Sequence, residues 1–327
     1  MSIEDDLDKR KWPKPPFEIG PSTEKQDERE AILRFAVREY DRSAFVSEGR
    51  IVLRHLGWKG LMKTVPPGES AITSLALDQR GRILGLTSGD RSHLFVYDPE
   101  VDRAVDLCTI DRESIAKNSL VICREGVVFI GTRRRPGKSG PGRLLKFKTD
   151  FNETGWEDVG PKLEEVELPK ADQGVECLVY DDSKERIYGL TSPGGFLFSL
   201  DVQTCSHKLF GPVDELSEFS GCLIVGYDGR VYGGKRWGKM FEFDPELEVI
   251  TELPVRIPSL AGRQVYNRID SMALDRGSGK IYGGGTADGV LFIFDPSLKA
   301  VTSLGKPTAQ PRTRAIVVGK DRRVYGI

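Results

Sequence analysis

From about residue 70 onward, the chain alternates short apolar segments with polar turns. Each unit opens with a mostly apolar segment such as ECLVYD (176–181), and a second segment such as RIYGL (186–190) follows after a turn. A Gly-rich loop leads to a third segment such as FLFSLD (196–201), and a turn, often Asp-Pro, leads to a fourth. Short segments with an alternating pattern and no helical period predict four β-strands joined by hairpin turns.

The four-stranded unit repeats along the chain. Its copies are marked by a glycine after an apolar or aromatic residue in the second strand: Gly85, Gly131, Gly189, Gly233, Gly283 and Gly326. The intervals between these glycines run from 43 to 58 residues, which is typical of propeller blades. Because one such sheet cannot bury both of its faces alone, sheets packed around an axis are expected. The sequence therefore predicts an all-β protein with a β-propeller fold.

The last copy supplies only two strands, within RAIVVGK (314–320) and RRVYGI (322–327). The segment Ser43–Gly57 has the pattern of the third and fourth strands, in AFVSEGR and IVLRHLG. We predict that these N-terminal strands complete the last blade, which would remove an exposed sheet edge. This gives six blades over residues 43–327. The alternative is a fragment of a longer protein, with a seven-bladed propeller.

Residues 1–42 have a different pattern. The first twenty residues are charged and rich in proline, and they predict an extended arm. Ser22–Tyr40 predicts a helix, because Thr23 and Gln26 form a capping box before an amphipathic stretch.

Repeats of the form ITSLALDQRGRILGLT, followed by LFVYDP, resemble those of NHL, YVTN and gluconolactonase-type propellers. The paired glycines of VYGG and IYGG are similar to those of kelch repeats. The resemblance covers about residues 70–327. It implies the fold alone, because many functions share this fold.

The composition limits the cellular location and the classes of binding partner that are expected. The chain has 48 Lys and Arg against 49 Asp and Glu, so no global charge favours nucleic acid or an anionic membrane. No run of eighteen apolar residues predicts a membrane span, and the N-terminus lacks the apolar stretch of a secretory signal. Three of the five cysteines, Cys123, Cys177 and Cys222, fall in first strands and predict buried free thiols. Free thiols predict a reducing, cytoplasmic location.

Charge differs between the loops of the predicted blades. The loops between second and third strands are basic, and the turns between third and fourth strands are acidic. In propellers the first set surrounds the mouth of the central channel, so we expect a basic ligand face there. The alternative is that these charges only solubilise the surface.

The expected ligand-binding residues come from this basic face. Arginine suits carboxylate, sulfate or phosphate, and an aromatic ring beside it suits stacking on a sugar. The longest loop, TRRRPGKSGPGRL (132–144), has the features of a mobile flap. Alternatively, the aromatic rings pack against the next blade. The expected residues are Arg133, Arg134, Arg135, Lys138, Arg236, Trp237, Tyr266, Asn267, Arg268 and Arg314.

A metal site is the second expectation. Aligned first strands put one position of each repeat near the channel mouth: Thr73, Ser119, Glu176, Gly221, Asp270 and Arg314. Glu176 and Asp270 could hold a divalent cation through oxygen ligands, and the ion expected with such ligands is Ca²⁺. This is similar to the gluconolactonase-type arrangement, in which first-strand carboxylates bind a metal. Alternatively, Arg314 neutralises the two carboxylates.

No nucleotide-binding, zinc-protease or serine-hydrolase motif occurs in the chain. His93 is the one candidate general base, and with Tyr266 and Arg268 it would suit proton abstraction beside a uronate carboxylate. Two functions therefore stay open. The first is a recognition or scaffold propeller that binds an anionic small molecule, an acidic glycan or a protein. The second is an enzyme, either a lyase on uronate polysaccharides or a metal-dependent lactonase.

Overall fold

The computed structural model describes residues 69–89, 91–100, 102–149, 160–215, 219–260, 262–286, 288–307 and 310–327. All of them belong to one compact unit, Leu56–Ile327. The predicted arm and helix (1–42) and the predicted closing strands (43–57) lie outside the described residues. Within the described ranges, no helix is long and apolar enough to cross a membrane.

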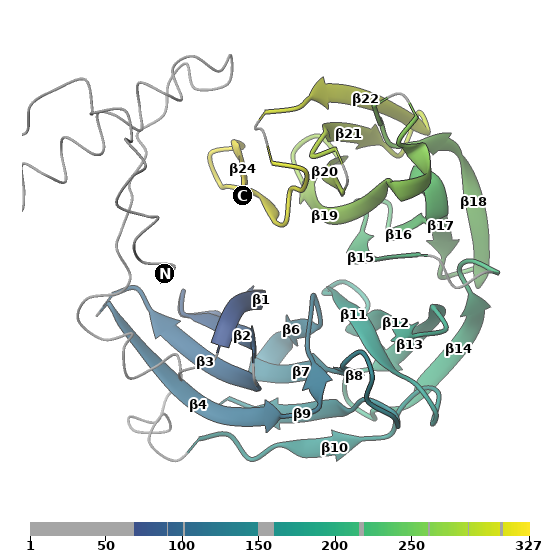
Figure 1. Ribbon diagram of the computed structural model, residues 1–327. Helices are drawn as coiled ribbons and strands as arrows, with labels where there is room; N and C mark the ends of the chain where they lie inside the picture. The colour runs from purple at the N-terminus through teal and green to yellow at the C-terminus, as the bar shows by residue number, and fades with distance from the viewer. Residues whose placement is uncertain are drawn as a thin grey trace, which may run out of the picture. The chain divides into compact units, whose positions relative to one another are not determined.

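Five antiparallel sheets of four strands follow one another along the chain (Figure 1). Each sheet is one blade, and the strand order confirms the predicted all-β propeller. Blade 1 is β1 (Glu69–Leu77), β2 (Ile83–Gly89), β3 (Ser92–Asp98) and β4 (Arg103–Asp111). Blade 2 is β6 (Leu120–Ile122), β7 (Val127–Gly131), β9 (Leu144–Lys148) and β10 (Glu164–Val166). Blade 3 is β11 (Gly174–Asp181), β12 (Arg186–Ser192), β13 (Phe196–Asp201) and β14 (His207–Pro212).

The remaining strands continue the same order. Blade 4 is β15 (Phe219–Val225), β16 (Val231–Lys235), β17 (Lys239–Asp244) and β18 (Val249–Arg256). Blade 5 is β19 (Arg268–Asp275), β20 (Lys280–Thr286), β21 (Leu291–Asp295) and β22 (Ala300–Gly305). In each blade the first strand lies innermost and the fourth lies outermost (Figure 1).

The repeated glycine allows an aromatic ring to cover the second strand. A Cβ atom added at Gly233 would lie 2.5 Å from Cε1 of Phe241 on the third strand, a distance that no real side chain tolerates. The same contact joins Gly85 to Phe95, Gly189 to Phe198 and Gly283 to Phe292. In these four blades the glycine repeats because a ring packs against it. Blade 2 is different, because Ile130 takes the equivalent position and Gly131 lies against Val175.

Apolar side chains fill the spaces between neighbouring blades. Leu178 and Phe198 of blade 3 pack with Val121 and Phe129 of blade 2, and similar clusters join blades 1 and 2, blades 3 and 4, and blades 4 and 5. Burial of this kind is the main force that holds the sheets together. Cys123, Cys177 and Cys222 are buried and free, as predicted. Burial raises the pKa of the Cys222 thiol to about 12.

The predicted number of blades is not what the described residues form. They make five complete blades, neither six nor seven. The sixth repeat forms only a two-stranded sheet, β23 (Ile316–Val318) and β24 (Val324–Gly326), which contacts β19. The strand pattern of the last repeat was therefore predicted correctly, but the blade is incomplete in the described residues.

The same repeat position differs in exposure around the propeller. Leu75, Leu178 and Leu223 each pair with the repeated glycine of their own blade. Leu178 and Leu223 are 7% and 8% exposed, because a neighbouring blade covers them on each side. Leu75 of blade 1 is 58% exposed.

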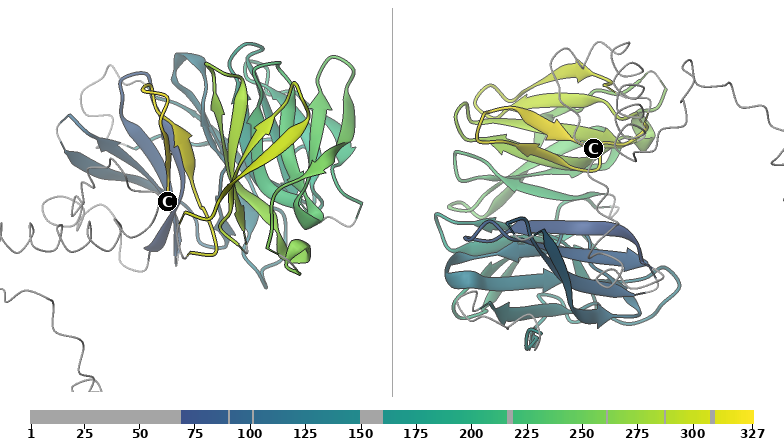
Figure 2. Two further views of the ribbon diagram at one scale, coloured as in Figure 1. Left: turned by 90° about the horizontal axis from the view of Figure 1, so that it is seen from above. Right: turned by 90° about the vertical axis from the view of Figure 1, so that its left-hand side faces the viewer.

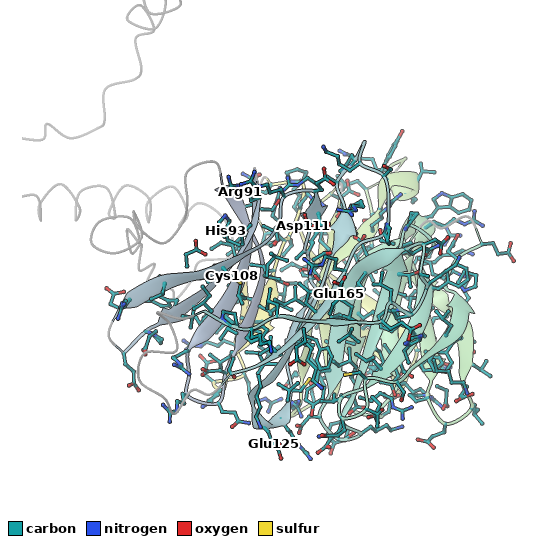
Figure 3. The ribbon with its side chains drawn as sticks, turned by 90° about the horizontal axis from the view of Figure 1, so that it is seen from below. Arg91, His93, Cys108, Asp111, Glu125 and Glu165 are labelled. Atoms are coloured by element: carbon teal, nitrogen blue, oxygen red, sulfur yellow. The ribbon has the colours of Figure 1, made fainter. Side chains whose placement is uncertain are left out.

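The blades present two opposite ends, which Figure 2 shows edge-on. We call the end with the turns between second and third strands the front face, and the end with the other hairpin turns the rear face. Arg91 and Asp111 lie toward the front face, whereas Glu125 lies at the rear (Figure 3).

Candidate functional site

β-bulges interrupt the first strands at the positions that the sequence aligned. The pairing of first and second strands slips at Thr73, Glu176 and Asp270, and the same irregularity occurs around Gly221. A bulge leaves one residue out of the ladder and re-aims its side chain. The equivalent positions that the sequence aligned therefore share a local structure in four blades.

In blade 2, the sequence alignment was wrong by one residue, because Ser119 is not the equivalent of Thr73. The ladder pairs Leu120 with Ile130 there, as it pairs Leu75 with Gly85 in blade 1, which makes Asn118 the equivalent of Thr73. Asn118 has a left-handed backbone (φ 50°), and its Nδ2 donates to the carbonyl of Gly221 in blade 4 over 2.8 Å. Ser119 is instead buried and donates to a main-chain carbonyl of its own blade.

Both predicted metal-binding carboxylates have an arginine partner. Oε2 of Glu176 lies 2.8 Å from Nε of Arg133, which comes from the front loop of blade 2. Asp270 receives two hydrogen bonds from Arg312, at 2.8 and 2.9 Å. Burial alone would raise the pKa of Asp270, but the bonds and the charge of Arg312 outweigh it and the pKa is lowered.

These partners are different from the one that the sequence suggested. Arg314 was the expected neutralising residue, but its side chain makes no ion pair with a described residue. No group of three His, Cys, Asp or Glu residues suited to a metal occurs within the described ranges. The calcium site therefore stays a prediction.

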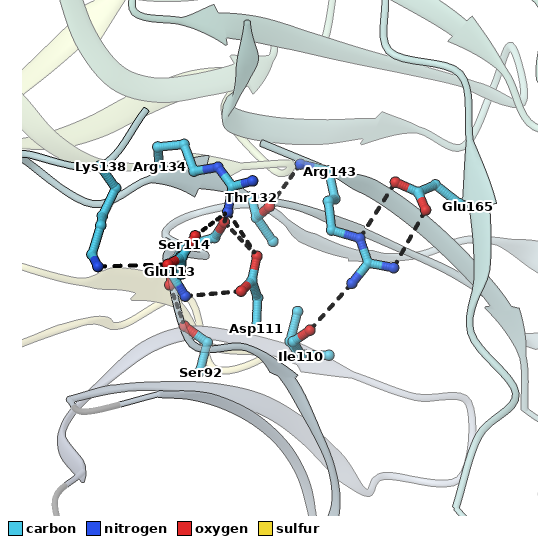
Figure 4. Close-up of polar contacts among 10 residues, drawn as sticks. All are labelled: Ser92, Ile110, Asp111, Glu113, Ser114, Thr132, Arg134, Lys138, Arg143 and Glu165. Atoms are coloured by element: carbon cyan, nitrogen blue, oxygen red, sulfur yellow. Dashed lines mark hydrogen bonds and ion pairs between the residues drawn. The ribbon is translucent and has the colours of Figure 1, made fainter. Parts of the chain in front are cut away.

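The basic loop of blade 2 is neutralised by acidic residues at the end of blade 1 (Figure 4). β8 (Arg133–Arg134) pairs with β5 (Ser114–Ile115), which brings the loop beside Asp111 and Glu113. Nη1 of Arg134 donates to Oδ2 of Asp111 over 3.4 Å, and Lys138 lies 3.5 Å from Glu113. A guanidinium N–H of Arg135 donates to the carbonyl of Gly89.

The carboxylate of Asp111 lies in an environment that favours its charged form. Partial burial would raise the pKa of Asp111. Hydrogen bonds from Glu113 N–H and the Ser114 hydroxyl, with the charges of Arg134 and Arg143, outweigh that effect, and the pKa is lowered. The carboxylate is thus ionised at neutral pH and compensates part of the loop charge.

Two turns on the front face of blades 4 and 5 differ from the blade 2 loop, because they expose aromatic and apolar side chains. The first is η3 (Arg236–Gly238), and the second contains η4 (Gln264–Tyr266) between β18 and β19. The two turns contact each other. We call them the turn pair, which consists of residues 236–238, 258–260 and 262–267.

Trp237 is held at the surface by a strained backbone. It has left-handed angles (φ 58°, ψ 30°) and is 37% exposed. Cζ of Arg236 lies 4.6 Å from the ring centroid, and Arg236 also pairs with the buried Asp214 at 3.5 Å. One face of the indole ring is therefore backed by a fixed cation, which is a favourable contact for an aromatic ring.

The second turn presents further apolar side chains beside Trp237. Tyr266 is 69% exposed, and Leu260 and Val265 are about half exposed. Arg268, at the start of β19, is exposed and makes no ion pair with any described residue. The predicted residues Trp237 and Tyr266 thus come from the two contacting turns, and Arg268 begins the strand that follows the second turn.

Asn267, also predicted to bind ligand, is buried. It is 1% exposed, and its Nδ2 donates to the carbonyl of Pro258 over 2.8 Å. In this structure Asn267 holds the turn together and does not face solvent.

The residues of the predicted lyase belong to separate blades. His93 lies on β3 of blade 1, where Nδ1 is 3.1 Å from a carboxylate oxygen of Asp106 on β4. The imidazole is buried (Figure 3 shows its place), whereas Tyr266 and Arg268 lie in blade 5. No contact between His93 and either of them occurs among the described residues.

The acidic residues of the rear face mainly build turns. Oδ1 of Asp244 accepts hydrogen bonds from the N–H groups of Glu246 and Leu247, at 3.0 and 3.2 Å. The Leu247 N–H and the Arg230 guanidinium lower the pKa of Asp244. Asp201 and Asp295 accept bonds at the same point of their own repeats. The repeated aspartate is therefore explained by turn formation.

No family model and no curated protein matches this chain. Among solved structures, the chain is similar to the Dos1 propeller, with 14% identity, a TM-score of 0.55, and coverage of 78% of this chain and 65% of that one. It is also similar to an auxiliary nutrient binding protein from Bacteroides thetaiotaomicron, with 12% identity, a TM-score of 0.54 and coverage of 79% and 67%.

A structural genomics protein of unknown function from Bacteroides thetaiotaomicron is a third neighbour, with 12% identity, a TM-score of 0.51 and coverage of 76% and 64%. The chain spans about two thirds of the length of each of these three proteins. At such identities the likeness shows the fold alone. It confirms the propeller and does not distinguish the NHL, YVTN, gluconolactonase and kelch families.

Proposed function

We propose that this propeller is a recognition protein that binds an acidic carbohydrate at the turn pair. Trp237 and Tyr266 would stack on sugar rings, and Arg268 would bind the carboxylate of a uronate unit. The observation that carries the proposal is Trp237, which is exposed on a left-handed backbone beside an exposed tyrosine of the next blade.

The backbone of Trp237 has an energetic cost. A left-handed conformation costs a residue other than glycine on the order of 1–2 kcal/mol. The free energy gained by burying an indole ring normally offsets such strain, but Trp237 is more than a third exposed. Strain that keeps a large aromatic ring at the surface supports a role in binding.

Charge supports an acidic ligand. The carboxylates that pair with Arg236 and Arg263 of the turn pair are buried, since the side chains of Asp214 and Asp288 are 3% and 0% exposed. Glu252, which is 40% exposed, is paired with Lys235 and Lys239 on either side of η3. Arg268 is exposed and has no carboxylate partner among the described residues. An arginine without a carboxylate partner in the described ranges, on a strand that contacts η3, suits a sugar that carries a carboxylate.

Recognition is favoured over catalysis by the separation of His93 from Tyr266 and Arg268. A binding role also fits the similarity to an auxiliary nutrient binding protein, although that similarity concerns the fold. The predicted cytoplasmic location stays a proposal, supported only by the free thiols.

The test is calorimetric titration with a short oligogalacturonate. The wild-type protein should bind, and Trp237→Ala should weaken binding about tenfold, because one stacking contact contributes roughly 1.4 kcal/mol. Tyr227→Ala is the matched control, since Tyr227 is an exposed aromatic residue on the rear face of blade 4. Absence of wild-type binding, or equal losses in both variants, would refute the proposal.

A further inference from the structure

The second turn of the turn pair is fastened by one fully buried carboxylate. Asp288 lies after β20, outside the turn, and its side chain is 0% exposed. One oxygen, Oδ2, accepts hydrogen bonds from the Ser259 hydroxyl at 2.8 Å and from the Leu260 N–H at 2.9 Å. The other oxygen, Oδ1, lies 3.2 Å from Nε of Arg263. Asp288 thus contacts three residues of the turn, Ser259, Leu260 and Arg263.

Asn267 fastens the other end of the turn. Besides its bond to Pro258, its amide lies beside Gly238 of η3, where an added Cβ would be 3.4 Å from Nδ2. The N–H of Ile257 donates to the carbonyl of Gly238 over 2.8 Å. The two turns are therefore linked to each other as well as to the sheet.

This arrangement has an energetic consequence for binding. A buried carboxylate is tolerated only when hydrogen bonds and an opposite charge compensate its lost hydration, and Asp288 has both. The same contacts limit the conformations of the turn that carries Tyr266. A turn that is ordered before it meets a ligand has less entropy to lose on binding.

We infer that Asp288 is a positioning residue. It orders the second turn of the turn pair and thereby sets the affinity of the protein for the carbohydrate. The inference rests on the proposed function for its ligand and on the contacts of Asp288 for its physical basis. Nothing in the pattern around Asp288 indicates this role, because its partners lie about 25 to 29 residues earlier in the chain.

The experiment combines hydrogen exchange with titration of the full chain. In Asp288→Ala, amides of residues 262–267 should exchange about tenfold faster, and the affinity for oligogalacturonate should fall about tenfold. Asp288→Asn retains an acceptor but loses the charge opposite Arg263, and its effects should be smaller. Asp295→Ala, at the rear end of the same blade, should change neither quantity.

Each result decides a separate point. Unchanged exchange in a folded Asp288→Ala variant overturns the positioning role, and so does faster exchange with unchanged affinity. If the wild-type protein does not bind oligogalacturonate, the proposed function fails, whereas the exchange data still report the ordering of the turn. If Asp288→Ala does not fold, Ser259→Ala removes one of the same hydrogen bonds and should show both effects in weaker form.

Discussion

Two basic regions of the front face differ in what surrounds their charges. The loop of blade 2 has more arginine and lysine residues, but carboxylates of blades 1, 2 and 3 pair with Arg133, Arg134, Lys138 and Arg143. The turn pair of blades 4 and 5 has fewer cations, yet Arg268, which directly follows it, is exposed and has no ion-pair partner among the described residues. The comparison shows that the number of basic residues in a loop does not indicate how many of them lack a carboxylate partner among the described residues.

The largest expected effect concerns the stability of the neutralised loop. Glu176→Gln should leave the partly buried Arg133 without its counter-ion and lower the free energy of unfolding by about 2 kcal/mol, between the values typical of exposed and buried pairs. The affinity for oligogalacturonate should not change. Chemical denaturation and calorimetry measure the two quantities.

Glu165→Gln is the control for that variant, because the pair of Glu165 with Arg143 is more exposed. We expect a loss below about 1 kcal/mol. If Glu176→Gln altered affinity instead of stability, the blade 2 loop would have to be assigned to the ligand site.

A second test separates the charge of Arg268, which follows the turn pair, from stacking on the aromatic rings of the turn pair. Arg268→Gln should weaken binding of oligogalacturonate about tenfold, because a charge-assisted hydrogen bond is lost. Binding of the neutral galactose oligomer should be unchanged by the same substitution. Calorimetric titration with both ligands decides it, and an equal loss for the two sugars would contradict the role given to Arg268.

The smallest expected effect is the contribution of Asp111 to acid sensitivity. Its folded pKa is lowered, so the unfolded chain binds the proton more readily. The stability that Asp111 contributes is therefore present above its unfolded pKa, near 3.8, and is lost as the pH falls through the lower folded pKa. Asp111→Asn should flatten the fall of the melting temperature between about pH 4 and pH 2. An unchanged slope would show that Asp111 is not held in its charged form by the loop.

Much of the fold was predictable because its causes are local. Alternating apolar residues, Asp turns and the glycine under a phenylalanine ring recur along the chain, the last of these in blades 1, 3, 4 and 5, and each can be recognised in a short window of sequence. The shift from Ser119 to Asn118 arose because Gly131, the glycine that marks the repeat in blade 2, lies one residue after Ile130, which takes the position of Gly85 in the ladder.

The candidate site was only partly predictable for a related reason. Trp237, Tyr266 and Arg268 could be selected by their residue types near turns. The partners that decide which cations are free, such as Glu176 for Arg133 and Arg312 for Asp270, come from other blades or from 42 residues away. Only the packing of the blades brings those charges together.

The central claim is that the turn pair, rather than the loop of blade 2, binds the ligand. The most direct measurement is titration of oligogalacturonate into two double variants, Trp237→Ala with Arg268→Gln and Arg134→Ala with Lys138→Ala. We predict that the first loses about a hundredfold in affinity and the second stays within about twofold. The claim would be contradicted if the blade 2 variant lost binding while the turn-pair variant kept it.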